Sequence, residues 1–404
     1  MERGPRAAHV AFNARGDGRR AGPLAVRTRH PKEIVMRRAV LALAAAALLP
    51  AELRAQVRDS LATTAPAEAR PRARAVVLPY VGSAPETGFQ YGATLFRVRQ
   101  PADSTTRPST AQLFATYTAK SQARAFAEID HWTARNTWRW IAHLEWQRFP
   151  LPYYGSGDDT PASAEETYTP RGLLAFATVQ RRVRGPLYAV GGYRFQDFDV
   201  VETADDGVLR LGGVVGSRGG RVGQLQGGAL WDSRDNVFAP YRGLFVQATG
   251  SVAAAAVGSR YRFTRTVVDA RRFVRVGDRR VVALQGVVET TGGTAPFDQL
   301  SLVGGSSYFR GYARGRFRDR HLASVQAEYR APVVGRLGWA AFAGGGRVTP
   351  RVGDLAGDDA RFLPSYGAGV RWLLFPRTRS TVRVDYGRGA DGQSGLYVAL
   401  NEAF

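Results

Sequence analysis

The feature that most constrains this chain is a repeated alternation of apolar and polar residues. Between Arg74 and Phe404, segments of about ten residues alternate with a period of two and end at turn-forming residues. No run of about 18 apolar residues occurs there. Alternation of this period predicts β-strands, because successive side chains of a strand point to opposite faces of the sheet. A tilted strand of about ten residues also spans an apolar layer of about 25 Å.

The clearest of these strands is the segment 137–148. One face carries Trp138, Trp140, Ala142, Leu144 and Trp146. The other face carries Arg139, Ile141, His143, Glu145 and Gln147. A soluble sandwich would hide such tryptophans, whereas in a bilayer the apolar row faces lipid and the polar row faces a lumen. Because every backbone group must be paired inside a membrane, we predict an all-β fold, a transmembrane antiparallel β-barrel.

We predict sixteen strands for this barrel, an even number that is typical of bacterial barrels. They lie near 74–83, 87–98, 110–119, 122–132, 136–148, 170–182, 186–198, 219–231, 241–253, 259–276, 279–291, 321–332, 336–347, 364–375, 378–388 and 393–404. The long connections 149–169, 199–218, 292–320 and 348–363 share one side, and the tight turns 183–185, 277–278 and 376–377 share the other. Long loops are typical of the outer side and tight turns of the periplasmic side. The segment 208–215 could instead form a strand of its own. In that case the register predicted for the strands before it would be wrong by one.

The beginning of the chain is typical of an exported protein. Arg37 and Arg38 precede the apolar run 39–49, and a cleavage site can follow at Ala55. We therefore expect translation to start at Met36 and residues 36–55 to be a signal peptide. Residues 1–35 would then be an upstream segment that precedes the true start. A buried helix is the alternative for the apolar run. We expect 56–73 to be a linker, 74–404 to be the barrel, and the bacterial outer membrane to be its location.

The chain offers few groups for catalysis. It has no cysteine, and the predicted barrel contains only three histidines. The candidate pairs are Asp130 with His131, His143 with Glu145, and Asp319 with His321. The first pair would point to opposite faces of a strand, and the second would share a lumen face where polar residues are expected anyway. We predict no enzyme, no cofactor and no metal site.

The basic charge of the chain does not indicate a nucleic-acid partner. The formal net charge is +22, but it is spread along the chain and is carried almost wholly by arginine. No basic arm or recognition module accompanies it. We therefore expect no nucleic-acid binding.

The end of the chain carries a row of apolar residues. Leu396, Val398, Leu400 and Phe404 fall on one face of the last predicted strand, and Glu402 interrupts the row. A terminal aromatic residue on an alternating strand resembles the C-terminal signal that outer-membrane barrels present to their assembly machinery. The alternative is an ordinary final strand.

Three groups of motifs resemble one known family. The first group comprises Gly304-Gly305, Tyr308-Phe309-Arg310-Gly311-Tyr312, Glu328-Tyr329-Arg330-Ala331-Pro332 and Phe342. The second group is the stretch Pro79–Gly88. The third group is Asp232-Ser233-Arg234-Asp235-Asn236 with Pro240 and Gly243. Together they resemble the BamA/TamA superfamily of outer-membrane assembly factors, also called the bacterial surface antigen family. The resemblance covers essentially all of 74–404, and it concerns the barrel domain only.

The resemblance implies a loop that folds back into the lumen. Arg310 would lie at the tip of that loop, in the motif with Gly311 and Tyr312, and would pair with Glu328 on the next strand. Alternation places Glu328 on an inward face, so the pair is possible. The alternative for Arg310 is a solvated loop charge.

A second acidic partner is missing from its usual place. Phe342 faces inward by alternation, but Gly344 stands where the family has an aspartate. Asp319 or Asp385 could take that role. The resemblance also implies that Asp232, Arg234 and Asp235 form a periplasmic turn.

The resemblance implies assembly or translocation of proteins at the outer membrane. In the family the first and last strands meet in a weak seam that can open for client proteins. The expected partners are outer-membrane lipid and lipopolysaccharide, the outer-membrane assembly machinery, and unfolded clients or a separate periplasmic protein. A passive pore or lipid-contacting barrel that has lost client handling is the alternative function. A soluble β protein that binds acidic ligands is a third, distant hypothesis.

Overall fold

The computed structural model describes residues 72–84, 87–103 and 105–404. The predicted upstream segment, the predicted signal peptide and nearly all of the predicted linker lie outside these residues, as do Pro85 and Glu86 of the predicted first turn. None of the described helices is long and apolar enough to cross a membrane.

Sixteen long strands account for most of the described chain. They are β1 (Arg72–Ala84), β2 (Gly88–Gln100), β3 (Ser109–Thr118), β4 (Ala123–Trp132), β5 (Trp138–Arg148), β7 (Glu166–Arg184), β8 (Leu187–Glu202), β9 (Gly219–Asp232), β10 (Gly243–Ala253), β11 (Arg262–Gly277), β12 (Arg280–Thr294), β15 (His321–Val334), β16 (Leu337–Thr349), β17 (Leu363–Phe375), β18 (Ser380–Gly389) and β19 (Ser394–Leu400). These strands match the sixteen predicted segments.

The remaining elements are short and lie in the connections. They are β6 (Leu151–Tyr153), β13 (Ser301–Leu302), β14 (Arg318–Asp319), α3 (Val208–Leu211) and the 3-10 helices η2 (Ala134–Asn136), η3 (Ala162–Ala164), η4 (Ala255–Val257), η5 (Phe297–Gln299) and η6 (Gly353–Leu355). The further strand considered for 208–215 is wrong. Val208–Leu211 forms a single helical turn, and the glycines at 212, 213 and 216 adopt positive φ, which breaks an extended run. The register of the earlier strands is therefore as predicted.

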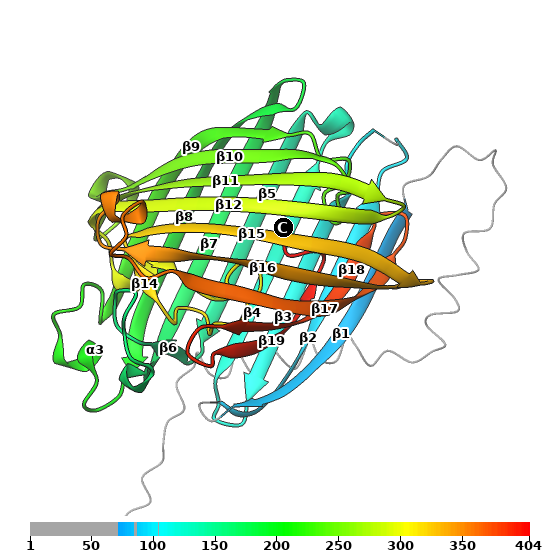
Figure 1. Cartoon of the computed structure of the whole chain (residues 1–404). Coiled ribbons are helices and arrows are strands. Elements are labelled where there is room, and N and C mark those ends of the chain that lie inside the picture. Colours follow the sequence, from blue (N-terminus) through cyan, green and yellow to red (C-terminus); the bar gives the residue numbers. More distant parts are fainter. Residues whose placement is uncertain (1–71, 85–86, 104) are drawn as a thin grey trace, which may run out of the picture. The chain divides into compact units, whose positions relative to one another are not determined.

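Each long strand pairs antiparallel with the next one, so the sheet follows the order of the chain from β1 to β19. The sheet curls around a lumen, and β1 and β19 are its two end strands (Figure 1). Among the described residues, no hydrogen-bonded ladder joins β1 to β19. The predicted class, an all-β transmembrane antiparallel barrel, is confirmed.

The two faces of the sheet differ as the alternation predicts. On β5 the outward side chains of Trp140 and Leu144 are 49% and 53% exposed, whereas the lumen-facing Glu145 and Gln147 are 5% and 6% exposed. A lipid-facing outer row is apolar because it has no water to solvate polar groups. The lumen row keeps its charges because they pair with one another, as in the 2.8 Å contact between Arg124 Nε and Glu145 Oε1.

The end of the chain differs from the expectation. The last strand stops at Leu400, and Asn401 adopts a φ of 60°, which turns the chain away from the strand. Leu396 and Val398 remain on the outer face, each 69% exposed, but Phe404 is only 4% exposed and packs inside the barrel against Phe273. The predicted single row that ends at Phe404 is therefore wrong. Alternation could not show that the lumen offers Phe404 an apolar site on β11 and β12.

Candidate functional site

The connection between β12 and β15 folds back into the lumen. Its side chains Val303, Phe309, Tyr312 and Phe317 are each at most 3% exposed. They pack against Val287, Leu322, Val348 and Leu363 of the wall. This apolar packing places the tip of the loop deep inside the barrel and brings Arg310 to the wall.

Arg310 is the centre of a buried ionic cluster. Its Nη2 atom lies 2.6 Å from Oε2 of Glu328, and its Nη1 atom lies 2.8 Å from Oδ2 of Asp385. The guanidinium also stacks on Phe342, with Cζ 3.4 Å from the ring centroid. The side chains of Arg310, Glu328 and Asp385 are all 0% exposed. Two carboxylates and an aromatic face thus replace the water that a buried guanidinium loses.

Asp385 on β18 supplies the second carboxylate of this cluster. Gly344, which stands at the family's usual acidic position, has no room for one, because a Cβ atom there would lie 2.2 Å from the carbonyl oxygen of Val325. Asp319, the other candidate, lies instead in β14 and accepts a 2.7 Å hydrogen bond from the backbone N–H of Arg320. The carboxylate that is missing at Gly344 of β16 is therefore supplied by Asp385 of β18, two strands further along the sheet.

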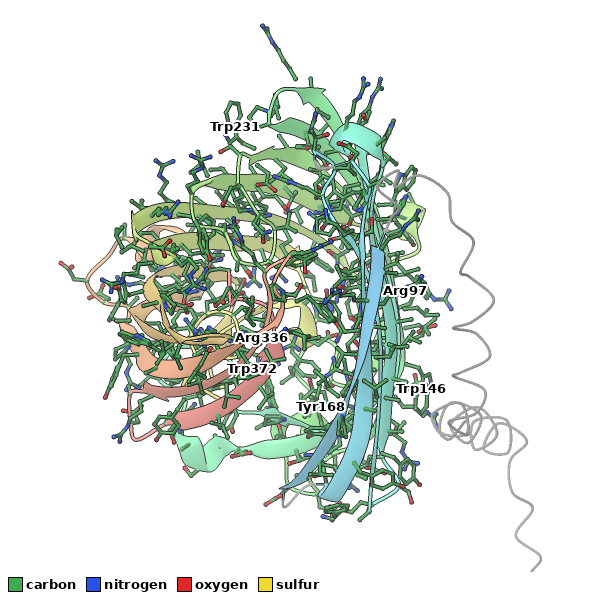
Figure 2. The ribbon with its side chains drawn as sticks, turned by 90° about the vertical axis from the view of Figure 1, so that its right-hand side faces the viewer. Arg97, Trp146, Tyr168, Trp231, Arg336 and Trp372 are labelled. Atoms are coloured by element: carbon green, nitrogen blue, oxygen red, sulfur yellow. The ribbon has the colours of Figure 1, made fainter. Side chains whose placement is uncertain are left out.

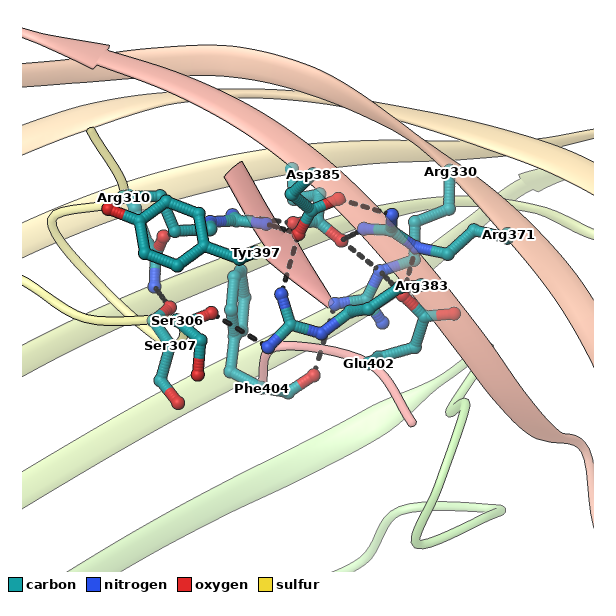
Figure 3. A network of polar contacts seen from close by, with 12 residues as sticks. Ser306, Ser307, Arg310, Arg330, Arg371, Arg383, Asp385, Tyr397, Glu402 and Phe404 are labelled. Carbon is teal, nitrogen blue, oxygen red and sulfur yellow. Dashed lines mark hydrogen bonds and ion pairs between the residues drawn. The ribbon is translucent and has the colours of Figure 1, made fainter. Parts of the chain in front are cut away.

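Three further arginines surround the same carboxylates (Figure 3). Arg383 Nη1 lies 2.6 Å from Asp385, Arg330 Nε lies 2.7 Å from Glu328, and Arg371 Nη2 lies 3.2 Å from Glu328. Arg371 Nε also pairs at 2.8 Å with Glu402, which follows the last strand. The cluster therefore links the loop to β15, β17, β18 and the end of the chain.

Gly311 and Tyr312 attach the backbone of the loop to the wall. Gly311 has a φ of +116°, and a Cβ atom there would lie 2.4 Å from the carbonyl carbon of Arg388. Its N–H donates to Oη of Tyr397 at 2.9 Å, and that hydroxyl donates to the carbonyl oxygen of Tyr312 at 2.9 Å. Tyr312 in turn donates its own hydroxyl to the carbonyl oxygen of Pro364 at 2.7 Å. A residue larger than glycine cannot make this close approach.

The anchor of the tip lies on the last part of the sheet. Glu328 belongs to β15, Phe342 to β16, Asp385 to β18 and Tyr397 to β19. The loop therefore fastens the strands on the C-terminal side of the β1–β19 seam to one another.

The turn between β9 and β10 holds the other predicted motif. Asp232 has a fully buried side chain and pairs with Arg234 at 2.9 Å and with Arg107 at 2.6 Å. Arg107 comes from the turn between β2 and β3, so the pair joins this turn to the N-terminal side of the seam. Burial lowers the pKa of the Arg234 guanidinium, and the Asp232 carboxylate opposes this shift.

The same turn also contacts the C-terminal side of the seam. Asp235 Oδ2 pairs with Arg379 at 2.8 Å, and Nδ2 of Asn236 donates to the carbonyl oxygen of Thr378 at 3.1 Å. Phe238 belongs to an apolar cluster that contains residues from both sides. The cluster comprises Val76, Phe96, Val98, Phe238, Leu374, Phe375 and Leu400. The β9–β10 turn thus bridges the two ends of the sheet, mainly through side chains.

The lumen also contains a polar cavity of about 540 Å³ beside the loop. Arg194, Arg265, Glu289 and Asp298 contribute to its lining. Tyr308 of the loop donates its hydroxyl to Glu289 Oε1 at 3.1 Å. Burial raises the pKa of Tyr308 above its ordinary value, and the carboxylate of Glu289 raises it further. Most of its lining side chains are polar, and Val267, Leu300 and Leu302 add an apolar part.

Of the histidines considered for catalysis, His143 is part of the lumen wall. His143 lies 3.0 Å from Glu128 and 3.3 Å from Glu145, and its ring stacks on that of Phe176 with centroids 4.9 Å apart. Asp130 pairs at 2.7 Å with Arg139 and not with His131. Within the described residues, no group of three or more side chains is arranged to hold a metal ion.

Comparison with known proteins agrees with this architecture. Residues 222–390 match the model of the Omp85 superfamily domain. No curated protein matches the chain. Among solved structures, the chain is similar to BamA from Haemophilus ducreyi lacking POTRA domains 1–3, with a TM-score of 0.52 and 14% identity, over 82% of this chain and 70% of that one.

Two CdiB structures are similar at the level of the fold. CdiB from Escherichia coli has a TM-score of 0.55 and 11% identity, over 81% of this chain and 62% of that one. CdiB from Acinetobacter baumannii has a TM-score of 0.51 and 12% identity, over 82% of this chain and 59% of that one. This chain therefore spans less than two thirds of the length of these two proteins.

The fold defines a transmembrane β-barrel, and the barrel is located in the bacterial outer membrane. More particularly, residues 222–390 match the Omp85 superfamily domain, and the fold is similar to those of BamA and CdiB, so the resemblance drawn from the sequence is confirmed.

Several residues of the site were not singled out by the sequence. Tyr397, Arg383, Arg107 and Phe238 belong to no motif that we used, although each takes part in a contact described above. The alternation was the available signal for Arg383, because it places Arg383 on the same inward face of β18 as Asp385. No comparable signal exists for Arg107 and Phe238, which lie in turns.

Proposed function

We propose that this barrel assembles or translocates other proteins at the outer membrane, and that the opening between β1 and β19 is the route. The observation that carries the proposal is the seam itself. Sequential strands are joined by backbone ladders, whereas the two end strands are linked by none among the described residues. Separating them therefore breaks no backbone ladder among the described residues.

The loop anchor supports this function in a second way. Because Arg310 and Tyr312 fasten the strands after β12 together, the C-terminal side of the seam can move as one body. An opening then occurs at the seam and not between two paired strands. The partner that this geometry suits is an unfolded client that contributes a strand to an exposed edge.

The absence of cysteine from the chain allows a direct test. Val77→Cys on β1 and Val398→Cys on β19 place two thiols on the outer face, where a flexible bis-maleimide can join them. The matched control joins Leu95→Cys to Leu113→Cys, which are already paired between β2 and β3. The assay is the insertion rate of an unfolded outer-membrane protein into liposomes that contain the barrel.

We expect the barrel to accelerate insertion, the seam cross-link to remove most of the acceleration, and the control cross-link to preserve it. Equal acceleration with and without the seam cross-link would contradict the route through the seam. No acceleration by any form of the protein would contradict the proposed function and favour a passive barrel.

A further inference from the structure

The strand ends and turns on the tight-turn side of the sheet are strongly basic. The exposed arginines there are Arg74, Arg97, Arg99, Arg135, Arg184, Arg242, Arg272, Arg275, Arg279, Arg280, Arg336 and Arg377. The acidic residues of the same turns and strand ends are Asp103, Asp232, Asp235, Asp278 and Glu402. The tight-turn rim, defined by these residues, therefore carries an excess of positive charge.

The acidic residues of this rim are already engaged. Asp232 and Asp235 hold the β9–β10 turn as described above, Asp278 pairs with Arg275 at 3.3 Å, and Glu402 pairs with Arg371 at 2.8 Å. Asp103 accepts hydrogen bonds from Thr105 and Thr106, which lower the pKa of its carboxyl group. Most of the exposed arginines are left without an acidic partner among the described residues. They are Arg97, Arg99, Arg184, Arg272, Arg279, Arg280, Arg336 and Arg377.

The opposite rim has a different charge pattern. Its long connections carry Asp158, Asp159, Glu165, Asp199, Glu202, Asp205, Asp206, Asp354, Asp358, Asp359 and Asp391. Arginines of the same connections pair with several of these, as in the 2.7 Å contact of Arg148 with Glu202 and the 2.6 Å contact of Arg361 with Asp391. The positive excess is therefore a property of one rim and not of the whole surface.

Tryptophans mark the level of the membrane interface next to the basic rim. Trp231, Trp339 and Trp372 are 43%, 39% and 51% exposed, and each lies within a few residues of a tight turn. Figure 2 labels two of them, Trp231 and Trp372, together with Arg97 and Arg336. Aromatic side chains of this kind prefer the headgroup region of a bilayer. The arginines just beyond them therefore lie at the height of the lipid phosphates.

Several of these arginines point outward from the sheet. Arg272 pairs in register with Leu284, which is 43% exposed on the lipid side, and Arg97 shares its face of β2 with the exposed Leu95. A side chain on the outer surface of a membrane-spanning sheet is adjacent to lipid. The arginines also follow the turns along the sheet from β2 to β18 and do not form a single patch, which fits a surrounding layer of small ligands better than one docked protein.

We infer that the tight-turn rim binds the phosphate headgroups of anionic phospholipids in the leaflet that it faces. Guanidinium groups bind phosphate oxygens in a bidentate manner, which suits arginine more than lysine at this level. The inference goes beyond the proposed function, because it holds whether or not the seam opens for a client.

The tryptophans beside the rim provide the measurement. Wild-type protein is reconstituted in phosphatidylcholine vesicles that contain phosphatidylglycerol, with bromine on the chains of either one lipid or the other. We expect brominated phosphatidylglycerol to quench tryptophan fluorescence more strongly, with a relative binding preference of about fivefold per site. Equal quenching by the two lipids would overturn the inference and leave an acidic protein surface as the occupant of the rim.

A charge-matched pair of variants locates the effect. The rim variant carries Arg97→Gln, Arg272→Gln, Arg336→Gln and Arg377→Gln. The control carries Arg218→Gln, Arg260→Gln, Arg262→Gln and Arg351→Gln, which are exposed on the opposite side. We expect the rim variant to lose the preference for phosphatidylglycerol and the control to retain it. Equal preference in both variants would overturn the inference, and heat-modifiable gel migration verifies that each variant is folded.

Discussion

Arg310 and Asp385 form an ion pair of 2.8 Å across 75 residues of sequence, and neither side chain is exposed to solvent. One residue lies at the tip of a loop and the other lies in the wall of the barrel. The pair helps to fix the conformation of the loop because the buried guanidinium of Arg310 has no water to solvate it and depends on carboxylates of the wall for compensation.

Arg310→Ala should therefore destabilise the folded barrel strongly. Removal of one partner from a buried ionic cluster costs about 3–5 kcal/mol, and Arg310 has two carboxylates to neutralise. The free energy of unfolding in urea, followed by heat-modifiable gel migration, measures the effect. Arg314→Ala in the same loop is the control, because that side chain is exposed and has no ion pair among the described residues. An equal loss in both variants would contradict the anchoring role of Arg310.

A double variant tests whether Arg310 and Glu328 act together. If the pair is coupled, Arg310→Ala combined with Glu328→Ala should cost clearly less than the sum of the two single changes, because each single change already removes the contact between the two side chains. The same unfolding measurement gives the coupling free energy. Strict additivity of the two single effects would show that the contact does not contribute.

Moving the second carboxylate to the family's usual position should fail. Asp385→Asn removes a charge that Arg310, Arg371 and Arg383 share, and Gly344→Asp would restore one nearby. A side chain at 344, however, would collide with the carbonyl oxygen of Val325. We expect the double variant to be less stable than Asp385→Asn alone in thermal unfolding; recovery of the wild-type melting temperature would show that the wall can adjust.

Gly311→Ala should detach the tip of the loop. The substitution combines an unfavourable positive φ with a collision against the backbone at Arg388. Gly305→Ala is the matched control, because Gly305 also has a positive φ, of +133°, but no atom lies within 4 Å of its added Cβ. The excess loss of stability in Gly311→Ala over Gly305→Ala reports the close approach alone. Limited proteolysis of the loop would show the same difference.

Phe238→Ala should loosen the seam without unfolding the sheet. The side chain lies in the apolar cluster that spans the two end strands, and its removal leaves a cavity there. Spin labels attached at Val77→Cys and Val398→Cys should then give a broader and longer distance distribution. Phe263→Ala, which empties a buried site in a separate cluster, should leave that distribution unchanged. An unchanged distribution in Phe238→Ala would mean that the turn does not hold the seam.

The sequence predicted the strands well because their constraint is local. Each strand must alternate in order to face lipid on one side and a lumen on the other, so every segment carries its own signal, as Trp140 and Glu145 do on β5. The pairing of Arg310 with Glu328 could also be anticipated, because the same alternation places the side chain of Glu328 on the inward face of its strand.

The remaining contacts depend on three-dimensional closure and not on local pattern. Asp385 was one of two candidates, and only the curvature that brings β18 towards the loop distinguishes it from Asp319. The inward course of Phe404 and the reach of Phe238 across the seam have no periodic signal, since both residues lie beyond the ends of strands. Sequence periodicity defines the wall of this barrel, but not what crosses its interior.

The seam between β1 and β19 has a consequence for alignment. A hydrogen-bonded ladder fixes which residue lies opposite which, and a shift by one residue would turn every side chain to the wrong face. Side-chain packing through Phe238 imposes no such correspondence on the two end strands. Backbone pairing therefore sets no register between β1 and β19 among the described residues. Under the proposed route, an incoming strand can align with β1 by its own pattern of side chains.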